Sequence, residues 1–302
     1  MARSTATPVP ARPPRPRDVL ELLKPITWFP PIWAFMCGVV SSGEAWGPRV
    51  PFILLGIMLT GPLVCGTSQA INDWFDRHVD AINEPGRPIP SGRIGGQWGL
   101  WIAIAGSALS LAVAALAGPW VFGATSLALA AAWAYSAPPF RAKMSGLWGP
   151  ALVAISYEGL TWFTGASVMA GGLPPVPVLV VLLLYSAGAH GIMTLNDFKA
   201  VEGDRAMGIR SLPVVAGVDR AVRIACWTMA VPQVAVIALL LSMGHIGGGV
   251  IVAALLAGQV ALMPRLIHDP VGQAPWYNAT GTTMSVLGML AAALGLGGVL
   301  PL

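Results

Sequence analysis

Charged residues are scarce in this sequence. Asp, Glu, Lys and Arg make up 10% of its 302 residues and hydrophobic residues make up 55%, whereas about a quarter of the residues in a soluble globular domain are charged. This shortage excludes an ordinary soluble domain. The charge-free stretches are as long as membrane-spanning helices, which need about 20 residues each. We therefore predict an all-α integral membrane protein.

Cysteine and histidine are also few. Cys37, Cys65 and Cys226 lie inside predicted spans without pair spacing, and the four histidines show no ligand spacing. These patterns argue against a disulfide framework and against a thiolate metal site, and the cysteines read as small buried hydrophobic residues. The first sixteen residues hold five prolines and no apolar core, unlike a signal peptide. We expect residues 1–20 to form a disordered cytoplasmic tail.

The apolar stretches predict nine transmembrane helices, with eight as the nearest alternative. The helices are expected singly in 25–43, 50–72 and 270–302, and in pairs in 94–140, 144–196 and 224–264. The pairs divide at Gly118-Pro119, at 171–175 and at 244–249. Residues 21–302 would then form a single domain.

The basic residues predict the orientation. With nine spans and a cytoplasmic N-terminus, sixteen of the 17 Lys and Arg residues fall on one side and only Arg49 falls on the other. Basic residues collect on the cytoplasmic side of membrane proteins. The net charge of +4 reflects this asymmetry, so we do not expect a nucleic-acid partner.

Two acidic clusters each end a long apolar run. The first is Asn72-Asp73-x-x-Asp76-x-x-x-Asp80, whose three carboxylates stand at i, i+3 and i+7 and would share one helix face. Carboxylates at membrane depth are costly and usually functional. Their oxygens are ligands that Mg²⁺ prefers.

The second cluster repeats this frame. It reads Asn196-Asp197-x6-Asp204, with Ala200 in place of the middle Asp, and lies 124 residues after the first. The offset predicts an internal duplication of helices one to four and five to eight, with a ninth helix added. Two facing clusters would make a Mg²⁺ site that carries a phosphorylated ligand.

Basic residues on the same predicted loops suit a diphosphate. Those near the clusters are Arg77, Arg87, Lys199, Arg205 and Arg210, and the loop after the fourth helix adds Arg141 and Lys143. Two Mg²⁺ ions, or Mn²⁺ as substitute, with Lys and Arg on the remaining oxygens would stabilise a leaving diphosphate. An apolar channel would shelter an allylic cation from water. These features together indicate prenyl transfer.

The clusters and the layout resemble the UbiA-type intramembrane prenyltransferases over residues 20–300. Five strings further resemble the chlorophyll and bacteriochlorophyll synthases, among them those of purple bacteria. They occupy residues 24–31, 80–85, 87–92, 157–160 and 195–204. The resemblance implies a helical ring around a central cavity with cytoplasmic capping loops. It implies catalytic roles for Asp73, Asp76, Lys143 and Arg87.

The resemblance also implies the substrates. A geranylgeranyl or phytyl group would pass from its diphosphate to the C17 propionate of a chlorophyllide or bacteriochlorophyllide. That carboxylate is ionised at neutral pH, since its pKa is near 4, so no strong general base is needed. The implied location is a bacterial inner or intracytoplasmic photosynthetic membrane, where pigment-biosynthesis or assembly proteins are candidate partners.

Four residues are candidates for the substrate cavity, namely Tyr135, Tyr157, Glu158 and His190. Glu158 could contact the tetrapyrrole or the cation, or could merely hydrogen-bond another helix. For His190 we favour packing over a role as axial ligand of the pigment's Mg²⁺.

The sequence departs from the family pattern in two places. Without its middle Asp, the second cluster would hold its metal with fewer protein ligands and more water. The short Tyr-x-x-x-Lys element is stretched, so Arg141 and Lys143 compete for one role, and we favour Lys143.

Other functions stay open. The acceptor could be haem, a benzoate or a homogentisate. A secondary transporter is less favoured, because transporter sites usually lie near the midplane of the membrane. A pigment-binding or assembly protein without catalysis would need no metal-diphosphate site.

Overall fold

A computed structural model describes residues 13–300 of the chain. Within this range the secondary structure is helical, apart from one isolated bridge between Ser145 and Arg210. The predicted all-α class is confirmed. Most of the predicted disordered tail, residues 1–12 of 1–20, lies outside the described residues. The rest of that tail differs from the prediction, because the helix α1 begins at Pro16.

The first half contains the longest uninterrupted run. Its elements are α1 (Pro16–Leu22), η1 (Pro25–Thr27), α2 (Phe29–Ser41), η2 (Gly47–Arg49), α3 (Val50–Met58), η3 (Leu59–Cys65), α4 (Gly66–Asn83), α5 (Trp98–Leu116) and α6 (Pro119–Ser136). From η2 to α4 the chain stays helical. The η3 segment is a π-helical turn around Pro62; a proline inside a helix removes one hydrogen bond and clashes with the preceding turn.

The second half contains another helix with a π-helical turn, formed by α7, η5 and α8. Its elements are η4 (Ala142–Met144), α7 (Trp148–Ala154), η5 (Ile155–Leu160), α8 (Thr161–Ala170), α9 (Val176–Leu195), η6 (Asn196–Ala200), α10 (Val201–Ala206), α11 (Leu212–Ala216), α12 (Val218–Ser242), α13 (Ile246–His268), α14 (Pro270–Ala279) and α15 (Gly281–Leu296). The predicted breaks at Gly118 and Gly171 are present. Both glycines have positive φ, of 103° and 65°, which other residues rarely adopt.

Six helical runs in the described part of the chain are long and apolar enough to cross a membrane. They are 47–83, 98–116, 176–206, 218–242, 246–268 and 270–296. The protein is therefore a multi-pass membrane protein. This count does not reach the predicted nine. A further apolar helix, α2, has 13 residues, fewer than the about 20 that a perpendicular span needs.

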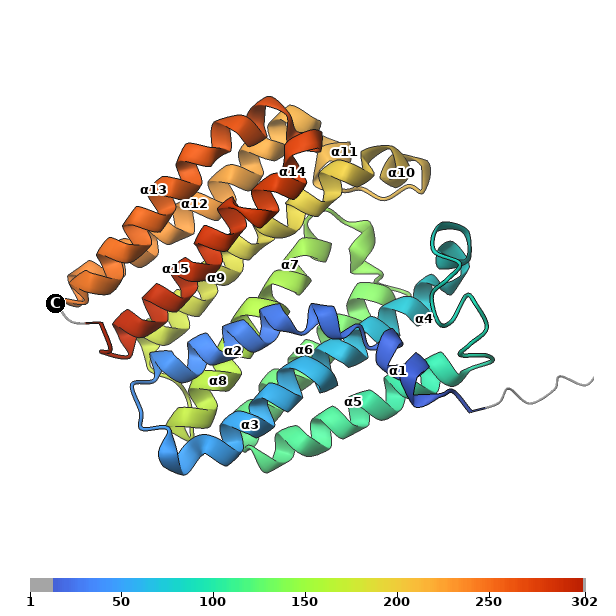
Figure 1. Cartoon of the computed structure of the whole chain (residues 1–302), viewed down its shortest axis with the longest axis horizontal. Helices are drawn as coiled ribbons and strands as arrows, with labels where there is room; N and C mark the ends of the chain where they lie inside the picture. Colours follow the sequence, from blue (N-terminus) through green and yellow to red (C-terminus); the bar gives the residue numbers. More distant parts are fainter. Residues whose placement is uncertain (1–12, 301–302) are drawn as a thin grey trace, which may run out of the picture.

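The helices pack into two groups that meet along α7 and α9 (Figure 1). In one group α2 lies against α8, and in the other α9, α12, α13 and α15 lie side by side. The contact between α2 and α8 depends on glycine. A Cβ at Gly38 would lie 2.8 Å from the Ala166 nitrogen, and one at Gly165 would lie 2.9 Å from the Val39 nitrogen. Small residues allow such close approach of membrane helices.

The loops divide between the two ends of the bundle. At one end the loop after α2 lies near the C-terminal end of α15, and the Arg49 guanidinium lies near Gly171 after α8. At the other end α4 and α9 finish, and α10 and α11 follow (Figure 1). Both acidic clusters therefore lie at the same end of the molecule, as the duplication predicts.

Candidate active site

A cavity of about 640 Å³ lies where α4, the loop after α6 and the segment after α9 meet. It brings together most of the predicted metal ligands and two of the predicted cations. The polar residues that line it are Asn72, Asp76, Asp80, Tyr135, Arg141, Lys143, Ser145, Asn196, Asp197, Asp204 and Ser211. The two acidic clusters and the stretched Tyr135–Lys143 element thus meet at one cavity.

Asp76 is the acid of the first cluster that meets the loop after α6. Its carboxylate contacts the Lys143 ammonium and lies 3.8 Å from Nη2 of Arg141. Asn72 donates to Oδ2 of Asp76 at 3.0 Å. Burial lowers the pKa of Lys143, and Asp76 offsets this only in part. Both basic residues of the stretched element therefore converge on one carboxylate.

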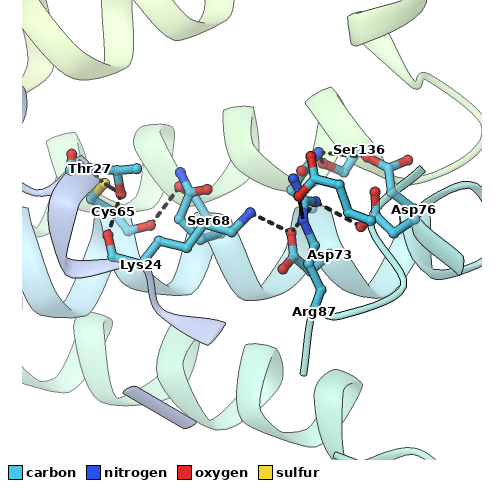
Figure 2. A network of polar contacts seen from close by, with 12 residues as sticks. Lys24, Thr27, Cys65, Ser68, Asp73, Asp76, Arg87 and Ser136 are labelled. Carbon is cyan, nitrogen blue, oxygen red and sulfur yellow. Dashed lines mark hydrogen bonds and ion pairs between the residues drawn. The ribbon is translucent and has the colours of Figure 1, made fainter. Parts of the chain in front are cut away.

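Asp73 differs from the other two acids of the first cluster. It is fully buried and does not line the cavity. Lys24 donates to its Oδ1 at 2.7 Å, and Nη1 of Arg87 lies 3.3 Å away (Figure 2). Its other oxygen, Oδ2, is buried without a hydrogen-bond partner.

Arg87 joins two acids of the first cluster. Its Nη1 also donates to Oδ2 of Asp80 at 2.8 Å, and its Nε donates to Glu84 at 2.5 Å. Burial works to lower the pKa of Arg87, but Glu84, Asp73 and Asp80 outweigh it and the pKa is raised. Arg87 itself does not line the cavity. Lys24 was missed because no spacing rule connects it to an acid 49 positions away.

The second cluster carries no such counter-charge. Asp197 lies on η6 and Asp204 on α10, the two helical segments that follow α9. Both line the cavity, and neither forms a salt bridge within residues 13–300. Two acids without a basic partner at one cavity favour binding of a cation.

The donor set fits Mg²⁺ if substrate phosphates and waters complete the coordination of the ion. No group of three or more His, Cys, Asp or Glu side chains in the described part of the chain is close enough to hold a metal ion. Mg²⁺ is usually bound by one or two carboxylates together with substrate phosphates and waters, rather than by a closed protein cage. The unpaired oxygens of Asp197 and Asp204 suit such an open site.

The remaining predicted cations do not line the cavity. Arg77 donates to the Trp74 carbonyl at 2.7 Å and lies 4.2 Å from the centre of the Trp74 ring. Lys199, Arg205 and Arg210 also lie outside the lining, and Arg210 contributes its backbone to the bridge with Ser145. Their assignment to the diphosphate stays a prediction.

A second, largely apolar cavity of about 330 Å³ adjoins the first. The two share Asn72, Tyr135, Val153 and Met193. Its walls include both π-helical turns, η3 and η5, and Tyr157 on η5 accepts hydrogen bonds from Gln69 at 3.1 Å and Cys65 at 3.4 Å.

Two of the four predicted substrate residues therefore line a cavity, namely Tyr135 and Tyr157. Glu158 lies outside both linings. His190 lies outside them as well, and its Nε2 is 3.1 Å from the Leu147 carbonyl.

Comparison with known proteins agrees with this geometry. Residues 28–286 match the UbiA prenyltransferase family. The chain belongs to this family. The bacteriochlorophyll synthase 33 kDa chain of Cereibacter sphaeroides is 58% identical to it over 286 residues, which cover 95% of each chain. The resemblance noted in the sequence is therefore confirmed.

Two solved structures share the UbiA fold. A digeranylgeranylglyceryl phosphate synthase superimposes with a TM-score of 0.74 at 20% identity, over 94% of this chain and 98% of the other. A UbiA homolog from Archaeoglobus fulgidus bound to GPP and Mg²⁺ has a TM-score of 0.66 at 21% identity, over 93% and 99%. At such identities the likeness establishes the fold alone.

Proposed function

We propose that this UbiA member is a Mg²⁺-dependent prenyltransferase that esterifies a tetrapyrrole. It transfers a geranylgeranyl or phytyl group from the diphosphate to the C17 propionate of bacteriochlorophyllide or chlorophyllide. One observation carries the proposal: a cavity with two acidic clusters and two cations opens onto an apolar cavity. The 58% identical bacteriochlorophyll synthase chain supports the choice of acceptor.

The metal would be held by oxygens of both clusters. We assign this role to Asn72, Asp76, Asp80, Asn196, Asp197 and Asp204, which line the cavity. The role of Asp73, which lies outside the lining, stays a prediction. Two Mg²⁺ ions, or Mn²⁺ instead, would neutralise the charge that develops on the departing diphosphate. The UbiA homolog from Archaeoglobus fulgidus was solved with GPP and Mg²⁺ bound, which supports a divalent metal.

The chain's own residues bind the diphosphate and protect the prenyl group. Lys143 and Arg141 face the cavity and would contact phosphate oxygens. The apolar cavity would hold the prenyl chain, and its walls would keep water from the allylic carbon. No histidine lines either cavity within the described residues, in keeping with an acceptor carboxylate that needs no general base.

We further propose nine spans arranged as a ring around both cavities. Beyond the six runs given above, α2, α6 and the continuous helix α7–η5–α8 would complete the nine. The ring is supported by the contact of α15 with α2, which brings the last helix against the first apolar helix. Residues 21–302 form one domain with pseudo-repeated halves. The end with both clusters faces the cytoplasm of a bacterial inner or intracytoplasmic membrane, where pigment-biosynthesis or assembly proteins are candidate partners.

The chemical identity of the product tests the proposed function. Membranes that contain the protein are incubated with Mg²⁺, a prenyl diphosphate, and bacteriochlorophyllide or chlorophyllide, and the product is identified by mass. We expect a prenyl ester of the tetrapyrrole. Prenylation of haem, a benzoate or a homogentisate instead would move the chain to another acceptor class, and the absence of any prenylated product would refute catalysis.

A further inference from the structure

Ser211 has a buried hydroxyl at the active-site cavity. The residue is 3% exposed, and its Oγ has no hydrogen-bond partner, although the side chain lines the cavity. Buried polar groups are nearly always hydrogen-bonded, and an exception calls for an explanation. A ligand that enters the cavity would provide the missing partner.

The position of Ser211 is fixed by a short pairing between two loops. The Arg210 nitrogen donates to the Met144 carbonyl at 2.9 Å, and the Gly146 nitrogen donates to the Arg210 carbonyl at 2.8 Å. We call this pairing the loop bridge. It connects the loop of Lys143 to the segment that follows Asp204, so Ser211 lies beside the basic loop and lines the same cavity as Lys143 and Asp204.

The loop bridge requires glycine at position 146. A Cβ there would lie 2.6 Å from the Ser211 carbonyl carbon and 2.9 Å from the Arg210 oxygen. Backbone atoms cannot yield to such a contact without moving the loop. The backbone at Ser211 is therefore held by this packing, whereas its hydroxyl has no hydrogen-bond partner.

The chemistry of the cavity favours a phosphate as the partner. Carboxylates accept hydrogen bonds but cannot donate them when ionised, and Lys143 is already paired with Asp76. A phosphate ligand here would need further donors, and the Ser211 hydroxyl is one that no protein group uses. Hydrogen bonds to a charged acceptor are stronger than those between neutral groups.

We propose that the Ser211 hydroxyl donates a hydrogen bond to the diphosphate of the prenyl substrate and so positions it between Lys143 and Asp204. This inference rests on the proposed function, since it assumes that the cavity receives a diphosphate.

The test compares Ser211→Ala with Ser167→Ala in the full-length purified protein. Ser167 is also 3% exposed with an unpartnered Oγ, but it lies on α8 outside both cavities. Dissociation constants are measured with Mg²⁺ for inorganic diphosphate and for an unreactive thio analogue of geranylgeranyl diphosphate. We expect both constants to rise about tenfold in Ser211→Ala, the effect of one hydrogen bond to a charged group.

Three further results are expected. Ser167→Ala binds both probes like the wild type, Ser211→Thr keeps the hydroxyl and stays near the wild type, and no variant changes the binding of bacteriochlorophyllide. Wild-type affinity for both diphosphates in Ser211→Ala overturns the inference. A selective loss of tetrapyrrole binding overturns it too.

The inference and the proposed function fail in different ways. If the wild type forms no tetrapyrrole ester, the proposed function fails, while the comparison with inorganic diphosphate still decides the role of Ser211. If the ester forms normally in Ser211→Ala and diphosphate affinity is unchanged, only the inference fails.

Discussion

At the scale of residues, the two acidic clusters differ in how their charge is balanced. Each acid of the first cluster contacts a basic residue from another segment: Asp73 contacts Lys24, Asp76 contacts Lys143, and Asp80 contacts Arg87. Asp197 and Asp204 form no salt bridge within residues 13–300. Uncompensated charge in a partly buried site is unfavourable. A bound metal ion should therefore stabilise the second cluster more than the first.

Removal of divalent metal is therefore expected to stop catalysis. Excess EDTA should abolish ester formation, and added Mg²⁺ or Mn²⁺ should restore it. Asp197→Asn keeps the shape of the side chain and removes its charge, so we expect turnover to fall about a hundredfold or more, as when a group that stabilises transition-state charge is lost. Glu202→Gln, on the same segment but outside the cavity lining, is the matched control. Full turnover in chelator, with carried-over metal excluded, would contradict a metal requirement.

Lys143 and Arg77 provide a second matched pair. Lys143 lines the cavity, whereas Arg77 is held against Trp74. Lys143→Ala should weaken binding of the prenyl diphosphate by about 1–3 kcal/mol through loss of a charge-assisted contact. Arg77→Ala should weaken it less than Lys143→Ala, because Arg77 lies outside the cavity lining. Titration calorimetry with the unreactive analogue measures both. An equal loss in the two variants would indicate a general electrostatic effect and not a contact.

The sequence predicted where the acids lie better than how they are paired. Helical periodicity placed Asp73, Asp76 and Asp80 on one helix correctly, because α4 runs through all three. Periodicity cannot reveal that Lys24 forms a hydrogen bond with Asp73, which lies 49 positions further along the chain. Nor can it reveal Ser211, whose interest comes from a missing hydrogen bond. Such facts depend on tertiary contacts.

At the scale of elements, the breaks in the helices determine where the cavities lie. The predicted divisions at Gly118 and Gly171 hold, because positive φ at glycine is encoded locally. Residues of the π-helical turns η3 and η5 line the apolar cavity. In the sequence, only Pro62 indicates one of these turns, η3. Asp197 and Asp204 lie on two separate helical segments, η6 and α10, and the frame that they share with the first cluster does not reveal this division. Regular spacing alone could not distinguish these cases.

The loop bridge should be sensitive to a single methyl group. Gly146→Ala places a Cβ against backbone atoms of Ser211 and Arg210, so the two loops must separate. We expect kcat/KM to fall at least tenfold, with a loss of stability of about 1–3 kcal/mol, typical of overpacking. Steady-state kinetics and thermal unfolding in detergent measure the two effects.

Gly203→Ala is the control for this change. A Cβ at Gly203 meets no atom within 4 Å, and the residue lies in the helix α10, where alanine is more favourable than glycine. Stability should be unchanged or slightly higher, and activity should be retained. Wild-type kinetics in Gly146→Ala would mean that the bridge does not position the site.

At the scale of the whole molecule, α15 against α2 brings the last helix beside the first apolar helix. Both acidic clusters lie at one end of the bundle, and Arg49 lies at the other, near Gly171. The location of both clusters at one end is predictable from the sequence because each cluster follows a long apolar run. The count of spans is harder, since α2 is short and a length rule passes over it.

Chemical labelling tests the proposed orientation. Glu44 and Asp219 are exposed residues that nine spans place on opposite sides of the membrane, with Asp219 on the cytoplasmic side. Cys37, Cys65 and Cys226 are buried, so the wild type should react little with a membrane-impermeant maleimide and can act as the background. We expect Glu44→Cys to be labelled in intact cells and Asp219→Cys only after permeabilisation, because the positive-inside rule places the basic end in the cytoplasm. The opposite pattern would place the active site outside, and labelling of both in intact cells would require a different number of spans between them.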